Sequence, residues 1–376
     1  MHKLTFLKAT LAVSGLIVLF HSTGIGQPAG NGFLASQYRP FDPRLEPMCL
    51  HTEGTRVLDA SGKPVWLYGV NIASLEWTTA GDHVPESVNR AIHDWKANFI
   101  RLPLAQDRWF GRMTNQTDSG ASYRALVDDI VATCAGARVY INLDLHWSDC
   151  GTWVNEGGKL GQHNLPDKNS ITFWQDLATR YKNHPNVVFG LYNEPHDATF
   201  AIWHDGGTVT DKPARWNPSQ VPVVYEAVGM QKLYNTVRAA GATNLVTVSG
   251  LDWGFDLSGV LQGYAITGSN FVYETHPYPF KDTNWDGYFG AVSEKYPVYV
   301  GEWGFGGRRS NSTNDLIYAN HLMDYTRQHD LHWTAWDLHV SAGPTLIKNW
   351  QYEPTVFGQF VKDQLATLAA AREAKP

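Results

Sequence analysis

Two glutamates follow buried, apolar segments of the chain directly. The stretch VVFGLYNEPHD begins as an apolar, β-prone run and reaches Asn193 and Glu194 before Pro195 ends it, and VYVGEWGF reaches Glu302 in the same way. A pair of carboxyl groups that face each other across a cleft is the equipment of glycoside hydrolysis, in which a retaining enzyme uses one as acid/base and the other as nucleophile. The two glutamates therefore raise this chemistry as the first hypothesis.

Other candidate strands also end in side chains that can bind a ligand or take part in a reaction. They carry Arg101 in FIRLPL, His146 in INLDLHW, Asp252 and Trp253 after LVTVSG, His276 and Tyr278 in ETHPYP, and Trp336 in TAWDLH. A salt bridge, a core contact or a helix cap explains any one of them alone. Their recurrence at seven of eight strand ends indicates one shared mouth, because the parallel strands of a barrel all end at the same face.

The elements that must position these residues alternate along the chain. Apolar runs predict strands at 67–71, 99–102, 138–145, 187–193, 245–249, 271–275, 298–302 and 332–336. Amphipathic segments predict helices at 85–97, 121–137, 170–183, 222–241 and 314–329. This alternation predicts an α/β fold, a single-domain (β/α)8 TIM barrel. The segment TRVLDASGKPVWLYGVN predicts an N-terminal hairpin that closes the bottom of the barrel.

The N-terminus predicts export. A basic start precedes the uncharged apolar run Ala9–Phe20, which is too short to span a bilayer comfortably, and GIG at 24–26 supplies small residues for cleavage. We therefore expect a signal peptide at 1–26, an N-terminal extension at 27–50 and the catalytic domain at 51–376. The expected location is secreted or periplasmic with no stable membrane insertion, and an uncleaved anchor is the alternative.

Composition excludes some functions and leaves others open. Charged residues make up 18% of the 376 residues, and the net charge of -6 without a basic stripe argues against nucleic acid. The 15 Trp, 17 Tyr and 16 Phe suit stacking on sugar rings as well as core packing. No CxxC or HExxH motif occurs, so no metal or cofactor is predicted. If one disulfide forms, Cys49–Cys134 is favoured and Cys150 stays free; a monomer is the default.

The ordered motifs resemble glycoside hydrolase family five, the cellulase family within the clan of retaining (β/α)8 glycosidases. LYNEP and VGEWG look like its signature elements after strands four and seven. FIRLPL, LDLHW, THPYP and TAWDLH match its other motif positions in order, and the resemblance runs from about Leu67 to Trp336. It implies that Glu194 is the general acid/base and Glu302 the nucleophile.

The same resemblance implies roles for the residues around the pair. Asn193 would hold the 2-hydroxyl of the sugar in the -1 subsite, and Tyr278 would donate to the nucleophile. His276 would lie near the acid/base, and Arg101 would pair with Glu302 and keep it charged. The -1 subsite would be lined by His146 and by Trp336 as its floor.

Loop residues are candidates for further subsites and for the walls of the cleft. The loop tryptophans are Trp77, Trp147, Trp153, Trp253, Trp285 and Trp303, of which Trp147 and Trp303 are favoured because they adjoin catalytic strand ends. Asp144 and Asp337 are expected to support the site rather than react. The segments 148–170 and 204–220 are expected to form walls of the cleft.

The leading interpretation is a retaining endo-β-1,4-glucanase. The same chemistry on mannan or xyloglucan, or transfer to a sugar acceptor, is the nearest alternative, because loops decide the substrate. A catalytically silent carbohydrate-binding protein is a second class, and the intact glutamate pair argues against it. A metal-dependent barrel hydrolase is a third, and resistance of the activity to chelators would separate it.

Overall fold

A closed barrel of eight parallel strands forms the centre of the computed structural model, which describes residues 43–148, 162–211, 222–306 and 312–374. The strands, in order around the barrel, are β3 (Tyr68–Asn71), β4 (Phe99–Ala105), β5 (Tyr140–Trp147), β6 (Val187–Gly190), β9 (Val246–Ser249), β10 (Phe271–Thr275), β11 (Val298–Val300) and β12 (His332–Ala335). Pairing of β12 with β3 closes the ring. The (β/α)8 prediction is confirmed, and each predicted strand overlaps a strand of the barrel.

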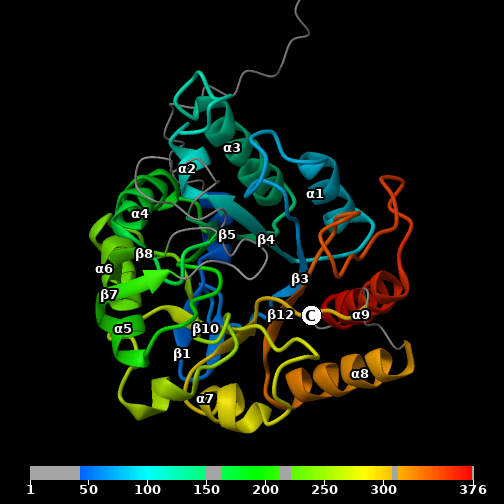
Figure 1. The fold of residues 1–376 in the computed structure, drawn as a ribbon. Coiled ribbons are helices and arrows are strands. Elements are labelled where there is room, and N and C mark those ends of the chain that lie inside the picture. The colour runs from blue at the N-terminus through cyan, green and yellow to red at the C-terminus, as the bar shows by residue number, and fades with distance from the viewer. Residues whose placement is uncertain (1–42, 149–161, 212–221, 307–311, 375–376) are drawn as a thin grey trace, which may run out of the picture. The chain divides into compact units, whose positions relative to one another are not determined.

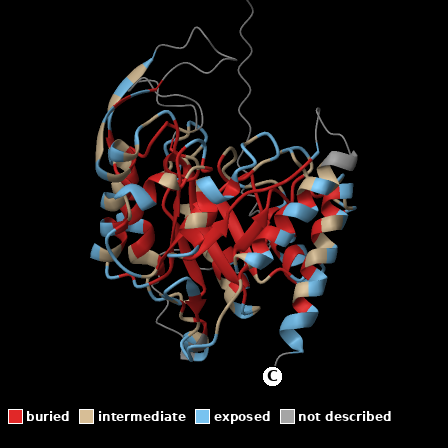
Figure 2. Cartoon of the chain, turned by 90° about the horizontal axis from the view of Figure 1, so that it is seen from below, coloured by how far each residue is buried: buried red, intermediate tan, exposed pale blue. Residues whose placement is uncertain are grey.

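Helices surround this barrel (Figure 1). They are α1 (Val84–His93), α2 (Gln106–Trp109), α3 (Ala121–Gly136), α4 (Lys168–Tyr181), α5 (Phe200–Asp205), α6 (Met230–Ala239), α7 (Ala291–Ser293), α8 (Ser312–Gln328) and α9 (Val356–Glu373), with short helical turns η1 (Pro43–Met48), η2 (Ser258–Gln262) and η3 (Asp286–Gly290). Figure 2 shows the strands buried and the helices exposed along their outer faces. In α1, for example, Val84, Val88 and Ala91 recur at helical spacing and are buried.

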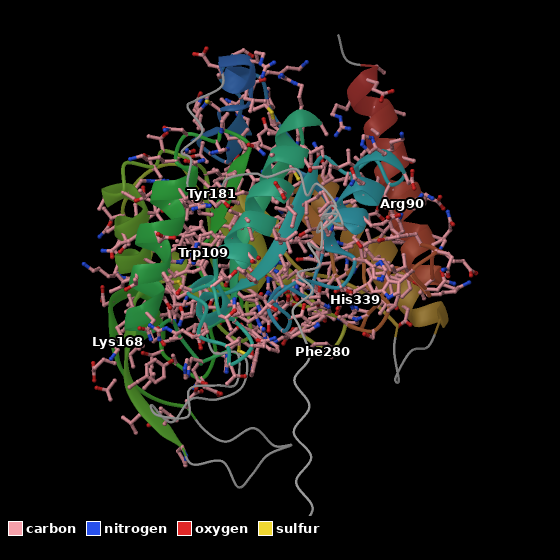
Figure 3. All side chains as sticks on the ribbon, turned by 90° about the horizontal axis from the view of Figure 1, so that it is seen from above. Arg90, Trp109, Lys168, Tyr181, Phe280 and His339 are labelled. Atoms are coloured by element: carbon pink, nitrogen blue, oxygen red, sulfur yellow. The ribbon has the colours of Figure 1, made fainter. Side chains whose placement is uncertain are left out.

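An N-terminal hairpin lies at the bottom of the barrel as expected, but its strands differ from the predicted ones: the two sides of the predicted turn at 59–63 meet in an isolated bridge between Leu58 and Pro64. It consists of β1 (His51–Glu53) and β2 (Arg56–Leu58), and Val57 joins a second core cluster. Its other buried members, at and near the starts of the barrel strands, are Met48, Leu50, Leu67, Phe99, Tyr140, Val188, Leu245, Val272 and Tyr299. Figure 3 places Phe280 and His339 at the opposite end of the barrel from this hairpin, where the site described below lies.

One predicted helix is partly a hairpin. The prediction placed a helix over 222–241, but Val223–Val228 is strand β8, which pairs antiparallel with β7 (Gly206–Asp211), and α6 starts only at Met230. The segment VVYEAV is rich in β-branched residues and alternates in exposure, which is the pattern of a strand with one covered face. The hairpin lies beside α5 and α6 (Figure 1).

The favoured disulfide does not form. Cys134 is fully buried on α3 within the main core, whereas Cys49 follows η1 at the bottom of the barrel and is only partly covered, and both thiols are free. The prediction was wrong because the two side chains pack into different environments. Cys150, the expected signal peptide at 1–26 and most of the extension at 27–50 lie outside the described residues. None of the helices within the described ranges is long and apolar enough to cross a membrane.

Candidate active site

Arg101 organises a polar network inside the upper part of the barrel. Its side chain comes from β4 and is fully buried. The guanidinium makes ion pairs with three carboxylates: Asp144 at 3.1 Å, Glu274 at 3.0 Å and Glu302 at 2.9 Å. Burial opposes the charged form of Arg101, but these carboxylates raise its pKa well above the ordinary value, so the residue is a fixed cation.

Glu302 receives a hydrogen bond on each carboxylate oxygen. It follows β11, and its side chain is nearly buried. Arg101 donates to Oε1 at 2.9 Å, and the Tyr278 hydroxyl donates to Oε2 at 2.8 Å. Burial and the charge of Glu302 raise the pKa of Tyr278 well above its usual range, so the phenol keeps its proton. The two donors fix the orientation of the carboxylate.

Glu194 contacts a histidine that lies between acidic groups. It follows β6 beside Asn193, and its side chain is more exposed than that of Glu302. The Nδ1 atom of His276 lies 3.1 Å from Glu194 Oε1, and its Nε2 atom lies 3.1 Å from Glu274 Oε1. Burial alone would lower the pKa of His276, but Glu302, Glu194 and Glu274 raise it to about 9, so both ring nitrogens carry protons at neutral pH.

Hydrogen bonds to both the oxygen and the nitrogen of its side-chain amide hold Asn193 in place. Its Oδ1 atom accepts from Arg101 at 2.7 Å, and its Nδ2 atom contacts Gln162 Oε1 at 3.0 Å and His146 Nε2 at 3.3 Å. Burial lowers the pKa of His146 to about 3, so the ring is neutral. Its Nδ1–H then donates to Asp144 at 2.7 Å, which leaves Nε2 as an acceptor for Asn193.

The separation of the two glutamates fits hydrolysis with retention of configuration at the anomeric carbon. A carboxylate oxygen of Glu194 and one of Glu302 lie within 4.8 Å of each other. Carboxyl groups about 5–5.5 Å apart suit attack by one of them on the sugar, whereas an intervening water needs roughly 6.5–9.5 Å. The site is therefore built for a covalent intermediate rather than for direct attack by water.

Glu194, His276 and Glu302 also form the group of described residues that could in principle hold a metal ion. A histidine ligand must be neutral and have a nitrogen lone pair to give. Both nitrogens of His276 instead face carboxylates, and its pKa of about 9 keeps the ring protonated. The donor set therefore does not fit a metal, and the absence of a metal requirement stays a prediction.

Chelation tests that prediction. We expect incubation with EDTA, followed by removal of the chelator, to leave the rate of substrate hydrolysis unchanged, because both nitrogens of His276 carry protons and have no lone pair for a metal. Loss of activity that a divalent cation restores would contradict this expectation.

The aromatic residues that were proposed for subsites divide into two groups. Trp336 follows β12 and lies parallel to His146, with ring centroids 5.2 Å apart and planes at 13°. Trp147 and Trp77 are partly exposed and contact each other, and Trp253 is 42% exposed. These rings lie near the mouth of the barrel.

The prediction for Trp303 requires a correction. Its ring is fully buried and packs edge-on against Trp333 and Phe357 in the core between barrel and helices, so no sugar can stack on it. Trp285 is likewise buried, and it stacks on His321. Trp303 follows Glu302 directly in the chain. Neighbouring side chains of extended backbone point to opposite sides, so Trp303 faces the core when Glu302 faces the site. Trp153 lies outside the described residues.

Several residues of the network were not predicted. Glu274 is a charge at the next-to-last position of the buried strand β10, two positions before His276 and therefore on the same side, which is the signal that could have revealed it. Asn71, at the end of β3, accepts from Arg101 at 3.1 Å and completes the set of strand ends. Gln162, from the loop after β5, lies in the segment 148–170 that was expected to form a wall of the cleft, but no motif singled it out.

Removing the central cation should destabilise the protein. We expect Arg101→Met to lower the free energy of unfolding by roughly 3–5 kcal/mol, because three carboxylates would lose their buried partner. Denaturant titration measures this, with Arg90→Met as a control, since Arg90 pairs with exposed acids on α1 and its loss should leave stability unchanged. Equal stability of Arg101→Met and wild type would contradict the network.

Two further acids are buried near Glu302. Glu76 is fully buried, with Oε2 accepting from the Ser74 N–H at 2.7 Å and no hydrogen-bond partner for Oε1 among the described residues. Burial, assisted by the charges of Asp144 and Glu302, raises the pKa of Glu76 to about 8. Burial also raises the pKa of Asp337 well above its usual range. Glu76 therefore keeps its proton at neutral pH.

Glu76 gives a prediction for stability against pH. The carboxyl keeps its proton up to about pH 8 in the folded protein but ionises near 4.5 in the unfolded chain, so folding takes up a proton between these values. Its contribution is present below pH 4.5 and is lost as pH rises through 8, at roughly 1.4 kcal/mol per pH unit at most. Glu76→Gln, which is neutral throughout, should lose less stability than wild type between pH 5 and 8. Parallel pH profiles in denaturant titrations would contradict this.

Comparison with known proteins identifies the family and the fold. The family model described as cellulase (glycosyl hydrolase family 5) matches residues 58–341. An endoglucanase of Paenibacillus polymyxa is 26% identical, over 80% of this chain and 83% of that protein. Endoglucanase E-5 of Thermobifida fusca is 24% identical over 76% of this chain, which spans only 54% of that relative. The crystal structure of a Saccharophagus degradans β-glucanase in complex with cellotetraose has a TM-score of 0.66 at 20% identity, covering 88% of this chain and 97% of the other.

Proposed function

The chain belongs to the cellulase family, glycosyl hydrolase family 5, and on that premise we propose that it is a retaining endo-β-1,4-glucanase with Glu302 as nucleophile and Glu194 as acid/base. One observation carries the assignment of roles. The two carboxyl groups are close enough for a covalent intermediate, yet Arg101 and Tyr278 hold only Glu302. The more exposed Glu194 is the group that can exchange protons with a leaving group and with water.

The first step forms a glycosyl ester. A carboxylate oxygen of Glu302 attacks the anomeric carbon, the bond from that carbon to the glycosidic oxygen breaks, and Glu194 transfers its proton to the departing oxygen. Arg101 and Tyr278 orient the nucleophile.

The second step reverses these roles. Once Glu302 is an ester its charge is gone, and Glu194 is ionised and can accept a proton from water. The water oxygen bonds to the anomeric carbon, the ester bond to Glu302 breaks, and the carboxylate returns to Arg101 and Tyr278. Two inversions at the same carbon give net retention.

The surrounding residues position the sugar between the glutamates. Trp336, backed by the neutral ring of His146, offers an aromatic floor, since a sugar presents C–H groups on its flat side. Asn193 is oriented by Arg101, so its Nδ2 can donate to the 2-hydroxyl when that hydroxyl replaces Gln162 or His146. Hydrogen bonds to the 2-hydroxyl strengthen in the transition state.

Aromatic residues on opposite sides of the mouth support binding within a long chain. Trp77 follows β3 and packs on His339, which follows β12. Trp253 follows β9, which lies across the barrel from β3 in the order of strands, and Phe280 follows β10 and is 77% exposed. Figure 3 shows Phe280 and His339 at the same end of the barrel. A row of rings across the mouth suits internal cleavage, and the endoglucanase names of the relatives support β-1,4-glucan as the polymer.

A polymer panel tests the substrate. Wild type and Glu302→Gln would be assayed on carboxymethylcellulose, mixed-linkage β-glucan, xyloglucan and mannan, with reducing ends and viscosity followed together. Endoglucanase action predicts fast loss of viscosity of carboxymethylcellulose at few new reducing ends. Preference for mannan or xyloglucan would contradict β-1,4-glucan as the substrate. Slow loss of viscosity would contradict internal cleavage of the chain. Activity on none of the four polymers would favour a carbohydrate-binding protein instead of an enzyme.

We also propose that the protein is exported. The basic start, the apolar run Ala9–Phe20 and the small residues at 24–26 support a cleaved signal peptide, and polymeric glucans are met outside the cell membrane. N-terminal sequencing of protein recovered from culture medium or periplasm tests this, and an intact Met1 in a cytosolic fraction would contradict it.

A further inference from the structure

A strained turn lies in the loop after β9, beside the proposed acid/base. Asp252, Trp253 and Gly254 take φ angles of 52°, 60° and 76° in succession. This left-handed region is unfavourable for residues other than glycine, and two such residues in a row persist only where their surroundings hold them. Backbone strain of this kind is found preferentially at functional sites.

The turn touches the surroundings of Glu194 from two sides. The Trp253 N–H donates to the carbonyl of Pro195 at 3.0 Å, and the indole stacks on His196 with centroids 3.5 Å apart and planes at 10°. Gly254 accepts from the His276 N–H at 3.1 Å. A Cβ atom at Gly254 would come within 2.7 Å of His276 Nδ1, the nitrogen that contacts Glu194.

Lys281 holds this turn from a different loop. Its side chain is only 12% exposed, its ammonium donates to the Asp252 carbonyl, and it lies 3.0 Å from the Asp252 carboxylate. The ammonium also lies 5.7 Å from the centroid of the Phe255 ring. The Lys281 N–H donates to the Tyr278 carbonyl at 2.9 Å, so the lysine is fixed relative to the donor of the nucleophile. Burial of a charged ammonium costs free energy unless polar partners compensate for the lost water. Here the partners are the carbonyl and the carboxylate of Asp252, which belong to the turn.

We propose that Lys281 is a positioning residue for the leaving-group side of the cleft, which holds the turn Asp252–Gly254 so that Trp253 presents its ring to the sugar beyond the scissile bond. The proposal rests on the proposed function. Because the general acid protonates the departing oxygen, the sugar being released lies on the side of Glu194. Trp253 stands on that side, with one ring face against His196 and 42% of the residue exposed.

Two substrate classes separate this role from a general structural one. An aryl β-cellobioside releases a phenol, whereas cellopentaose must place glucose units beyond the scissile bond. For Lys281→Met, which keeps the aliphatic stem, we expect kcat/KM on cellopentaose to fall roughly 10–100-fold, mainly through KM, and kcat/KM on the aryl cellobioside to change less than about 3-fold. Lys281→Arg should restore cellopentaose hydrolysis to within about 3-fold of wild type.

Two controls sharpen the test. Lys362→Met removes a similar cation, 5.8 Å from the Trp95 ring on the outer side of the barrel, and should change neither substrate. Trp253→Ala should lower cellopentaose hydrolysis as Lys281→Met does. The two changes together should cost no more than one alone, because both act through the same ring.

Hydrogen exchange tests the turn without any substrate. In Lys281→Met the Trp253 N–H, which donates to Pro195, should exchange at least about 10-fold faster than in wild type, with exchange in β9 unchanged. Equal loss on both substrates, additive effects with Trp253→Ala, or unchanged exchange would overturn the role of Lys281. A wild type that hydrolyses neither substrate would instead overturn the proposed function, and exchange would still decide whether Lys281 holds the turn.

Discussion

Glu302→Gln should lower kcat on every accepted β-glycan by on the order of 10⁵-fold, with little change in folding. The amide has nearly the shape of the carboxylate, and its one oxygen can still accept from Arg101 while its NH2 donates to the Tyr278 oxygen, but it is a poor nucleophile at the anomeric carbon. Initial rates on carboxymethylcellulose and on an aryl cellobioside measure the effect. Glu86→Gln, on the exposed face of α1, is the matched control and should behave as wild type.

Chemical rescue distinguishes the nucleophile from a merely important acid. Glu302→Ala opens space on the nucleophile's side of the sugar, so added azide should attack there and give the α-glycosyl azide from an activated aryl β-cellobioside. A β-glycosyl azide would mean that the removed group had acted on the second step instead. Such a product, or a variant with more than about 1% of wild-type activity, would contradict the assignment of Glu302.

Glu194→Gln should show an effect that depends on the leaving group. With cello-oligosaccharides, whose departing alcohol needs a proton, kcat should fall roughly 10²–10⁴-fold. With a 2,4-dinitrophenyl cellobioside the first step needs no acid, so the ester on Glu302 should form quickly and then await water without a base. The expected result is a burst of dinitrophenolate that equals the enzyme concentration, followed by slow turnover and a lowered KM.

Azide provides the complementary outcome for this residue. Glu194→Ala with azide should yield the β-glycosyl azide, because the anion enters on the face from which the leaving group departed. Equal losses on activated and unactivated substrates, with no burst, would remove Glu194 from its role.

The barrel followed from the sequence because its strands are buried on both faces. Runs such as FIRLPL and VVFGLYNEP stay apolar until the strand ends and then turn polar at the mouth, so pattern alone located both the strands and the ends that carry Arg101 and Glu194. The same rule overlooked Glu274, which lies inside β10 just before the strand ends and is compensated there by Arg101, His276 and Thr247.

The sequence did not reveal contacts between segments that lie far apart in the chain. The direction of the Trp303 side chain depends on which side of the backbone it takes after Glu302, and the structure turns it toward Phe357 in α9. The β7–β8 hairpin replaced the first part of an expected helix because alternation of VVYEAV outweighed the longer amphipathic pattern. The contact of Lys281 with Asp252 joins the loops after β10 and β9, and no motif or periodicity in the sequence predicts that these two residues meet.

A double displacement through an ester on Glu302 determines the anomer of the first product, so identifying that anomer tests the ester most directly. Proton NMR during the first minutes of cellopentaose hydrolysis, before mutarotation, distinguishes the two anomers of the newly formed reducing end. The carboxyl oxygens within 4.8 Å of each other predict that the β-anomer appears first and decays to the equilibrium mixture. Initial appearance of the α-anomer would show direct attack by water and would contradict the account.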